Sequence, residues 1–451
     1  MDSVTQLRKL GLFDARVPRY TSYPTANHFS DAVGPVEMRD WIRAIPEGAE
    51  VSLYVHIPFC RQLCWFCACR TQGTATAKPV DGYLKTLSRE IALLRRALPS
   101  GVRLSRLHWG GGTPTLLSPD QIKTLADLIL RTAPMAPGAE FSIEIDPNEI
   151  DATRLDALAA AGVNRASIGV QDFDPEIQAT IGREQSFAIT KDTADGLRAR
   201  GITSLNIDIL YGLPHQTRSR IGDSVQKVLS LNPDRVALYG YAHVPWMARR
   251  QALIPTDALP LPEARLDLFE TARNLFAWDG YTEIGIDHFA RPADGLARAA
   301  GAGLLRRNFQ GYTDDQADVL IGLGASAISR FPQGYAQNDP ATSRYKAAIV
   351  KGSFATVRGH KMSGEDHLRA AMISALMCTF RIEFEDISAR QSVDPEKVAR
   401  YATQVTEAFP GVVALTGGSL EIPPKARPMA RMIARALDVY STGGDAHSAA
   451  V

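Results

Sequence analysis

Six short apolar runs separated by helical patterns constrain the fold of this 451-residue chain more than any other feature. Each run has the length of one β-strand. They cover Val51–Ile57, Leu104–Trp109, Phe141–Asp146, Ala166–Phe173, Ser204–Tyr211 and Val236–Tyr241. Helical periodicity marks Tyr83–Leu98, Pro119–Thr132, Thr190–Arg200, Arg220–Leu231 and Leu261–Trp278. Strands that alternate with helices predict a parallel sheet of the α/β class, and six such units predict a (β/α)6 partial barrel.

Polar residues recur on one face of these strands. Glu144 alternates with apolar neighbours in the third strand, and Asp208 does so in the fifth. The polar face of the fourth strand ends at Gln171. One such carboxylate alone favours a solvated strand end or a helix cap. Several polar residues on the same face of successive strands predict a ligand-binding mouth at the carboxyl ends of the strands.

Four of the five cysteines lie within ten residues, at positions 60, 64, 67 and 69. Three thiolates with this spacing can hold three irons of a [4Fe–4S] cluster and leave the fourth iron to a ligand that is not protein. A long chain with an odd cysteine count argues against a disulfide framework, and a zinc site usually needs a second, distant Cys/His pair. We therefore expect Cys69 to be a non-ligand near the site and the isolated Cys378 to be a small buried hydrophobe.

Charge and composition argue against nucleic-acid-binding, membrane and secreted proteins. Lys plus Arg number 50 against 49 Asp plus Glu, which leaves no electrostatic footprint for nucleic acid or an anionic membrane. No apolar run approaches the ~20 residues that span a bilayer. The first residues show no charged-then-apolar signal peptide. We expect a cytoplasmic protein that works as a monomer, without nucleic acid or membrane.

The chain divides into four expected units. They are an N-terminal arm on the substrate side (1–46), the barrel with its extension (47–335), a mainly helical C-terminal domain (360–440) and a disordered tail (441–451). Helical periodicity is clear in His367–Phe380, and Gly417-Gly418 punctuates a short β element in the C-terminal unit.

The cysteine run resembles the signature of the radical S-adenosylmethionine (SAM) superfamily, in which SAM chelates the fourth iron. The glycine-rich turn Trp109–Thr115 resembles the superfamily motif that contacts the amino-acid end of SAM. Such a turn is common in α/β folds and is weak evidence by itself. Together with the cysteines it implies the partial barrel of this superfamily.

Further motifs resemble the oxygen-independent coproporphyrinogen III oxidases from about residue 10 to about residue 440. They are Arg19–Thr25, Glu144–Pro147, Gly169–Phe173, Gly182-Arg183, Tyr241–Pro245, Arg307–Thr313 and Gly324–Ile328. The first of these and the Cys67-Ala-Cys69 ending are the most telling, because the related haem-trafficking members of the superfamily are shorter and lack both.

This resemblance implies a radical SAM oxidoreductase of haem and porphyrin biosynthesis. In the implied reaction one electron from the reduced cluster cleaves SAM to methionine and a 5′-deoxyadenosyl radical. The radical removes hydrogen from the β-carbon of a propionate, and loss of carbon dioxide and one electron leaves a vinyl group. Two rounds convert coproporphyrinogen III to protoporphyrinogen IX. A low-potential donor such as a flavodoxin or ferredoxin would supply the electron.

The resemblance also implies the site residues. Cys60, Cys64 and Cys67 would bind the cluster, and one or two SAM molecules would contact Tyr54, Phe66, Gly111, Gly112, Thr113, Glu144, Gln171, Arg183, Asp208, Ala242 and Ile328. The catalytic candidates are Glu144, Arg183 and Gln310. Glu144 would accept from the SAM ammonium, Arg183 would pair with a carboxylate, and Gln310 would contact the substrate. Phe66 is equally suited to anchor its loop in the core.

A substrate with four carboxylates implies cationic groups around a broad apolar cleft. The candidates are Arg19, Arg183, Arg307 and Arg330, with ordinary surface pairing as the alternative. The aromatic residues Tyr20, Tyr23, Phe309 and Tyr312 would either stack on the tetrapyrrole or pack the N-terminal arm. A helical C-terminal domain would close the barrel mouth, or serve dimerisation or stability.

Two other functions remain open at this point. One is a haem-binding chaperone that keeps a cluster without making product. The intact SAM positions Glu144, Gln171 and Asp208 argue against it. The other is a radical SAM enzyme acting on tRNA, which the balanced charge disfavours.

Overall fold

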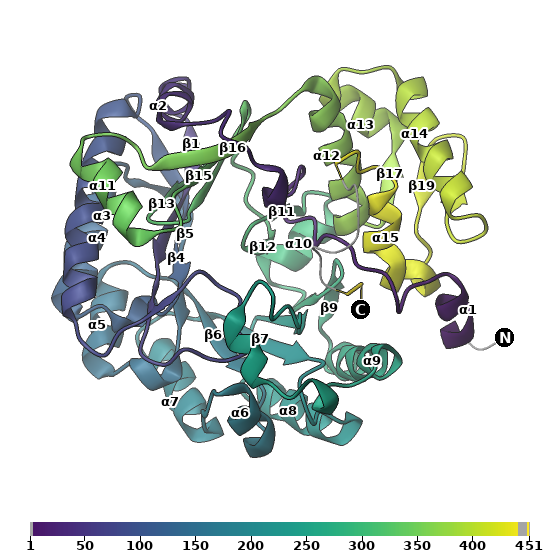
Figure 1. Ribbon diagram of the computed structural model, residues 1–451, viewed down its shortest axis with the longest axis horizontal. Coiled ribbons are helices and arrows are strands. Elements are labelled where there is room, and N and C mark those ends of the chain that lie inside the picture. The colour runs from purple at the N-terminus through teal and green to yellow at the C-terminus, as the bar shows by residue number, and fades with distance from the viewer. Residues whose placement is uncertain (1–2, 441–448, 451) are drawn as a thin grey trace.

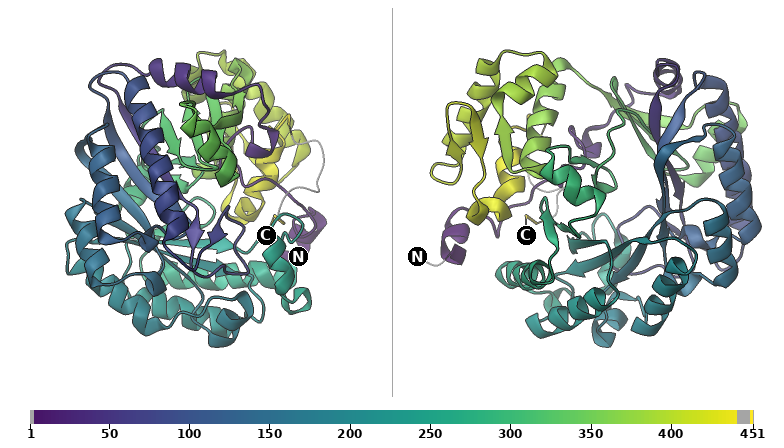
Figure 2. Two further views of the ribbon diagram at one scale, coloured as in Figure 1. Left: turned by 60° about the vertical axis from the view of Figure 1, so that its left-hand side comes forward. Right: turned by 180° about the vertical axis from the view of Figure 1, so that it is seen from behind.

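One mixed sheet of 12 strands organises the computed structural model, which describes residues 3–440 and 449–450 (Figure 1). Six parallel strands stand side by side in the middle of this sheet. They are β1 (Glu50–Ile57), β4 (Arg103–Gly111), β5 (Met135–Ile145), β6 (Arg165–Gln171), β7 (Ser204–Tyr211) and β8 (Arg235–Gly240). The sheet curves with its helices on the outside (Figure 2), which confirms the predicted (β/α)6 partial barrel.

Two strand boundaries differ from the prediction for physical reasons. β5 begins at Met135 instead of Phe141, because the earlier residues already pair with β4 before the register between the two strands shifts. β6 ends at Gln171 instead of Phe173, because Gln171 adopts a left-handed conformation with φ of 73° that no extended strand can continue through.

The helices expected between the strands are present. They are α3 (Lys78–Ala97), α4 (Pro119–Leu130), α7 (Phe187–Arg198), α8 (Arg218–Ser230) and α9 (Pro262–Trp278). Two short helices, α5 (Ala152–Ala160) and α6 (Pro175–Ile181), complete the layer. Side-chain caps set several starts; Ser186, for example, accepts from the N–H of Ile189 at 3.2 Å and begins α7. Within the described part of the chain, no helix combines the length and apolar character that a membrane crossing requires.

The predicted strand faces are confirmed in β5. Phe141 and Ile143 are 1% and 0% exposed and pack into the main hydrophobic core with the surrounding helices. Ser142 and Glu144 point to the opposite, inner face, where they contact the side chain of His108. The barrel interior is therefore polar, unlike the apolar filling usual in closed barrels.

After α9 the chain adds strands at both edges of the barrel. β9 (Thr282–Ile284) and β10 (His288–Ala290) extend the sheet beyond β8 in antiparallel fashion. The chain then crosses to the other edge, where β13 (Leu320–Leu323) pairs in parallel with β1. The antiparallel strands β14 (Ile328–Phe331), β15 (Gly334–Asn338) and β16 (Thr356–Lys361) follow, with α11 (Thr342–Val350) between the last two. Helix α10 (Gly295–Gly301) and the hairpin β11 (Arg306–Asn308) and β12 (Gly311–Thr313) lie between the two edges in sequence.

A second hydrophobic core lies in the C-terminal part, to the right in Figure 1. It is formed by α12 (Gly364–Cys378), α13 (Phe384–Gln391), α14 (Pro395–Ala408), α15 (Ala430–Arg435) and the small sheet β17 (Arg381–Glu383), β18 (Ala414–Leu415) and β19 (Ser419–Glu421). Cys378 is 6% exposed, as expected for a buried hydrophobe. The expected helical periodicity and the short β element are both present.

The N-terminal segment divides between the two cores. Helix α1 (Ser3–Lys9) and residues up to Tyr23 pack into the C-terminal core, whereas α2 (Pro35–Arg43) packs on the barrel. The unit boundaries expected at residues 46, 335 and 360 stay a prediction. The expected disordered tail, 441–451, lies outside the described residues except for Ala449 and Ala450; the latter donates its N–H to the carbonyl of residue 15 at 2.8 Å.

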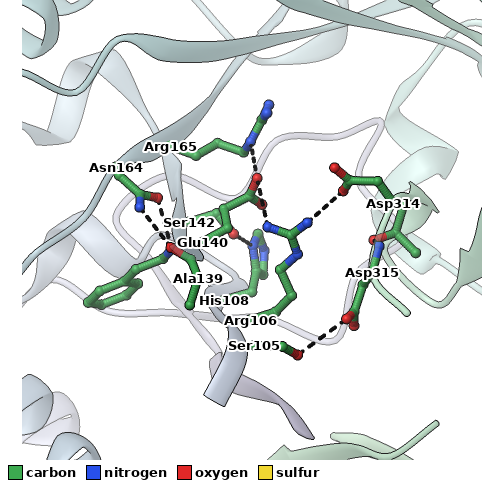
Figure 3. Close-up of polar contacts among 12 residues, drawn as sticks. Ser105, Arg106, His108, Ala139, Glu140, Ser142, Asn164, Arg165, Asp314 and Asp315 are labelled. Atoms are coloured by element: carbon green, nitrogen blue, oxygen red, sulfur yellow. Dashed lines mark hydrogen bonds and ion pairs between the residues drawn. The ribbon is translucent and has the colours of Figure 1, made fainter. Parts of the chain in front are cut away.

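An ion network closes the barrel at the amino ends of its strands (Figure 3). Arg165 at the start of β6 donates to Glu140 at 2.6 Å, as Figure 3 shows. It also donates to Asp294 at 3.1 Å. The members of this floor network are Arg106, Glu140, Arg165, Arg235, Asp294 and Asp314. Removing one partner of a buried ion pair costs several kcal/mol, so mutual pairing is a condition for charges at this depth.

Glu90 of α3 fastens the outer strands to the barrel. Its side chain is buried and accepts hydrogen bonds from the N–H of Gly324 at 2.7 Å, the amide of Asn338 at 2.7 Å and the hydroxyl of Tyr345 at 2.6 Å. Burial raises the pKa of Glu90 from its ordinary 4.5 to about 7.

This pKa predicts a pH dependence of stability. The folded chain binds the proton of Glu90 more tightly than the unfolded chain, so its contribution is full below about pH 4.5 and lost as the pH rises through about 7. At 1.36 kcal/mol per pKa unit the loss is about 3 kcal/mol. Urea unfolding midpoints between pH 5 and 8 should fall more steeply for the wild type than for Glu90→Gln. The exposed Lys85→Gln on the same helix should follow the wild type; equal slopes for all three proteins would contradict the assignment.

Candidate active site

The loop with the four clustered cysteines follows β1 and is closed at its base. The short strands β2 (Phe59–Cys60) and β3 (Gln72–Gly73) pair in parallel there. The N–H of Trp65 donates to a carbonyl at the end of α6 at 2.9 Å, and the side-chain amide of Gln251 donates to the carbonyl of Phe66 at 2.7 Å. Protein contacts at both base and middle therefore define the shape of this loop.

All five cysteines are free thiols, and three of those in the loop influence one another. Burial raises the pKa of Cys60 to about 11, with smaller contributions from Cys67 and Cys64. Burial also raises the pKa of Cys64. The pKa of Cys67 falls below its ordinary value, because the thiol of Cys69 donates a hydrogen bond to its sulfur.

These thiols fit a cubane cluster. Among the described residues, no three His, Cys, Asp or Glu side chains converge on the position of a single metal ion. In a [4Fe–4S] cluster, by contrast, each cysteine thiolate binds a different iron, so the ligands surround the group at its corners. Three neighbouring free thiols on one loop are the donors that such a cluster requires.

Arg183 links the cysteine loop to the barrel. Its guanidinium donates to Asp146 at 3.0 Å, to the sulfur of Cys64 at 3.6 Å and to the carbonyl of Gly169 at 2.8 Å. A cation beside a thiol favours the thiolate, which is the form that binds iron. The side chain lies beside the cysteines, and its salt bridge to Asp146 is a contact that the sequence did not predict.

The turn after β4 approaches the cysteine loop closely because its residues are glycines. Gly111 has φ of +111°, and a β-carbon there would lie 2.4 Å from the ring of His56. A β-carbon on Gly112 would lie 2.5 Å from the carbonyl oxygen of Phe59. The N–H of Thr113 donates to that same carbonyl at 2.7 Å. Any larger residue at either glycine would push the turn away from the start of the loop.

Glu144 lies at the centre of the mouth. The N–H of Gly111 donates to one of its oxygens at 2.9 Å, and the ring of His108 contacts the other at 3.4 Å. His108 also contacts Ser142 at 2.7 Å (Figure 3), and its ring stacks on Tyr54 with centroids 5.7 Å apart. Although its strand is central in the sheet, the Glu144 side chain is 41% exposed. The carboxylate is therefore accessible from the inner face of the sheet.

The surroundings of Glu144 keep it ionised. Burial would raise its pKa, but the hydrogen bond and charge of His108 and the N–H of Gly111 together lower the pKa below its ordinary value. The carboxylate is consequently a ready acceptor for a cationic group such as an ammonium.

Asp208 brings a second carboxylate to this mouth from β7. Its oxygens accept from Ser167 at 2.9 Å and from Asn206 at 2.8 Å. Burial raises the pKa of Asp208, and the charge of Glu144 adds to the rise, while the two hydrogen bonds act in the opposite direction. Gln171 ends the neighbouring strand. The structure thus brings together the carboxylates that strand alternation predicted.

The other predicted contacts lie on segments around the mouth. Phe66 is half-buried in an apolar cluster with α6 and residues near 241, which matches its loop-anchor interpretation. Ala242 lies two residues beyond the end of β8, and its carbonyl accepts from Gln251 at 3.0 Å. Ile328 begins β14 and is half-buried. Gln310 is exposed at the tip of the β11–β12 hairpin, where its main-chain N–H donates to the side chain of Asn308 at 2.9 Å.

The structure places the four arginines that were predicted to bind the substrate in different parts of the molecule. Arg307 and Arg19 come together, since Arg307 donates to the carbonyl of Arg19 at 2.7 Å. Arg183 lies beside the cysteines instead, and Arg330 donates to the carbonyl of Ala317 at 2.7 Å.

Three of the predicted aromatic residues serve packing. The hydroxyl of Tyr20 donates to Asp438 at 3.0 Å, and that of Tyr312 donates to the carbonyl of Met377 at 2.6 Å. Tyr23 is 3% exposed in the C-terminal core. These side chains fix the arm and the extension to the C-terminal core.

Comparison with known proteins gives a consistent result. Residues 54–228 match the model of the radical SAM superfamily. The oxygen-independent coproporphyrinogen III oxidase of Paracoccus denitrificans is 63% identical over 451 residues, covering 100% of both chains. Its Escherichia coli counterpart is 39% identical over 427 residues, covering 94% of this chain and 93% of that protein. The chain belongs to the oxygen-independent coproporphyrinogen III oxidase family.

A solved structure agrees over nearly the whole chain. Coproporphyrinogen III oxidase from Escherichia coli, described as a radical SAM enzyme, superposes with a TM-score of 0.89 at 38% identity and covers 94% of this chain and 97% of that one. The cofactors of a radical SAM protein are a [4Fe–4S] cluster and SAM. Both suit the donors found here, namely neighbouring free thiols and an ionised carboxylate.

His108 is the main site residue that sequence reasoning missed. It shares the inner face of β4 with Arg106, and in the sheet it stands opposite Ser142. The alternation of polar residues along Leu104–Trp109 was a usable signal. The contact between His108 and Glu144 depends on the register between β4 and β5, which the alternation of polar residues alone does not predict.

The thiol arrangement leads to a prediction about iron binding. Cys60→Ser, Cys64→Ser and Cys67→Ser should each lose the iron–sulfur absorption and most of the bound iron after anaerobic reconstitution, because each removes one corner ligand. Cys69→Ser and the distant Cys378→Ser should retain iron. Full iron content in any of the first three variants would contradict the ligand assignment.

The support given to Glu144 leads to a prediction about SAM. His108→Phe keeps the ring beside Tyr54 but removes the polar contact with the carboxylate. Loss of a hydrogen bond to a charged group costs about 1.5–3 kcal/mol, so the Kd for SAM should rise about tenfold or more. Calorimetry with reconstituted protein measures this. Iron content should be unchanged; an unaltered Kd would show that His108 does not position Glu144.

Proposed function

We propose that this protein catalyses the oxygen-independent oxidative decarboxylation of two propionate side chains of coproporphyrinogen III to vinyl groups, giving protoporphyrinogen IX. The observation that carries the proposal is a set of three neighbouring free thiols beside an ionised carboxylate, at the mouth of a partial barrel whose interior is polar. Full-length similarity to coproporphyrinogen III oxidases supports the choice of substrate.

In this proposal Cys60, Cys64 and Cys67 hold the cluster, and SAM completes the fourth iron. Glu144 accepts from the ammonium of SAM, and Asp208 accepts from its ribose hydroxyls or amino group. The chemistry that the cluster and SAM supply when bound is a one-electron cleavage of SAM that ends in removal of a hydrogen atom from the propionate β-carbon. The substrate radical would then release carbon dioxide and pass one electron to an external one-electron acceptor, leaving a vinyl group.

The chain's own residues supply position and enclosure. Arg183 contacts Cys64 and forms an ion pair with Asp146, and so joins the loop to the end of β5. The glycine turn brings its backbone against His56, Phe59 and Glu144 without side chains in the way. An alkyl radical reacts with almost any C–H bond, so a site with few mobile side chains and little water is required for a single product.

We further propose that a low-potential donor such as a flavodoxin or ferredoxin reduces the cluster, and that the enzyme works as a cytoplasmic monomer without nucleic acid or membrane. Five free thiols suit a reducing compartment, and 50 basic against 49 acidic residues give no surplus charge for a polyanion.

An anaerobic assay tests this function. Reconstituted protein with SAM, a low-potential reductant and coproporphyrinogen III should yield protoporphyrinogen IX and two molecules of 5′-deoxyadenosine for each product. Cys64→Ser is the matched control and should give neither. Deoxyadenosine without decarboxylation would move the substrate elsewhere, and tight haem binding without turnover would favour a haem-binding chaperone.

A further inference from the structure

The turn that follows β13 lies at the mouth of the barrel, and the function proposed above uses it only for the SAM contact expected at Ile328. β13 runs parallel to β1, with Leu323 beside Val55, so the two strands end at the same edge of the sheet. Parallel strands of α/β folds carry their ligand sites at this edge. β1 continues there into the cysteine loop, and β13 continues into residues 324–328, which we call the mouth turn.

The mouth turn has a backbone conformation that needs support from outside. Gly324 and Ser326 have φ of +98° and +65°, in the left-handed region that ordinary side chains rarely adopt. The N–H of Ser326 donates to the carbonyl of Asp339 at 3.1 Å, and the N–H of Gly324 donates to the carboxylate of Glu90 at 2.7 Å. Contacts with neighbouring segments therefore define the shape of this turn.

Tyr83 of α3 joins the mouth turn to the end of β1. Its hydroxyl oxygen accepts from the N–H of Ala325 at 2.9 Å, and the hydroxyl donates to the carbonyl of His56 at 2.8 Å. Burial and the charge of Glu90 raise the pKa of Tyr83 well above its ordinary 10, so the hydroxyl keeps the proton that it donates. One oxygen atom thus bridges two segments that lie far apart in the sequence.

The packing at this bridge is tight. A β-carbon on Gly324 would lie 2.4 Å from the hydroxyl oxygen of Tyr83 and 2.7 Å from the carbonyl oxygen of His56. A β-carbon on Gly322 in β13 would lie 2.6 Å from the carbonyl oxygen of Ile328. Glycine at these two positions allows the turn to approach β1 and β13 closely. A small shift of the hydroxyl would therefore move the turn.

His56 passes this position on to the other wall of the mouth. Its ring contacts the hydroxyl of Tyr54 at 2.9 Å and the carbonyl of Arg70, just after the cysteines, at 3.2 Å. A β-carbon on Gly111 would lie 2.4 Å from the same ring. Tyr54 and Gly111 are expected SAM contacts on this wall, as Ile328 is on the mouth turn. The Tyr83 hydroxyl is bonded to both walls.

Resting on the proposed function, we propose that Tyr83 is a positioning residue for the SAM site. Its hydroxyl holds the mouth turn and the end of β1 at a fixed separation, so that groups on both walls meet SAM together. Helix α3 packs on the outer side of the sheet, beside α11 (Figure 1), and Tyr83 therefore acts through the two backbones instead of touching the ligand. Fixing the walls before SAM binds removes an ordering cost from the binding step.

SAM binding by the anaerobically reconstituted protein tests this role. Tyr83→Phe keeps the ring, which packs against Phe59 and Tyr345, and removes only the hydroxyl. Because two hydrogen bonds between the walls are lost, the Kd for SAM measured by calorimetry should rise about tenfold. Iron content should stay at the wild-type value. Hydrogen exchange of the amides at residues 324–328 should become faster in the same variant.

Tyr345→Phe is the matched control. Its hydroxyl belongs to the same buried cluster, but it donates to Glu90 at 2.6 Å, and Tyr345 is 0% exposed. Removing it should lower the urea unfolding midpoint about as much as Tyr83→Phe does. The Kd for SAM should nevertheless stay within about twofold of the wild type, because the bridge between the walls remains. A merely structural role would shift the midpoint and the Kd together in both variants.

A pair of glycine variants tests the bridge from the side of the turn. Gly324→Ala places a β-carbon against the Tyr83 hydroxyl and should also raise the Kd for SAM with iron retained. Gly352→Ala is its control: Gly352 also has a positive φ, of +79°, but no atom lies within 4 Å of its β-carbon position. This variant should bind SAM as the wild type does. The glycine pair carries the test if Tyr83→Phe does not fold.

The outcomes separate this proposal from the proposed function. An unchanged Kd for SAM in Tyr83→Phe, or an equal rise in Tyr345→Phe, would overturn the positioning role and leave the activity standing. Loss of iron from Tyr83→Phe would show that the hydroxyl acts on the cysteine loop instead, and would also overturn it. Wild-type protein with a complete cluster that binds no SAM would refute the proposed function itself.

Discussion

The structure depends on charge pairing inside the barrel. Most barrels fill their interior with apolar side chains, but here charged residues occupy the inner face of the central strands. Arg165 between Glu140 and Asp294 illustrates the compensation at the floor. Unpaired charges at this depth would cost several kcal/mol each. Because the floor is neutralised by its own members, the mouth can present ionised groups to ligands.

On the inner face of the barrel, polar residues recur at every second position of a strand, from the floor network to the mouth. On β5 the residues Glu140, Ser142 and Glu144 follow one another on the inner side, and His108 of β4 contacts the latter two. The first belongs to the floor network and the last to the candidate SAM site. One strand thus serves both stability and binding, and the rigidity of the floor extends to the carboxylate that would hold the ammonium of SAM.

Sequence reasoning succeeded where the signal was local. The cysteine spacing, the strand alternation around Glu144 and the glycine turn each lie within a few residues, and the structure places these residues around one mouth. It failed to find contacts that join distant segments. The residues near Arg19 are an example. Gly240, Arg307 and Arg431 lie hundreds of residues away in the sequence, and only the packing of the two cores brings them close to Arg19. Tyr20 and Tyr23 illustrate the same limit, since their burial depends on that packing.

This long-range assembly has a consequence for how the protein works. The cysteine loop and the mouth belong to the barrel, whereas a cavity beyond β8 is lined by the arm, α9, β11 and α15 together. The barrel alone therefore holds the thiols and carboxylates proposed to bind the cluster and SAM, but it does not form this cavity. Contacts within the barrel position the groups that would initiate the chemistry, and contacts between the two ends of the chain form the walls of the cavity.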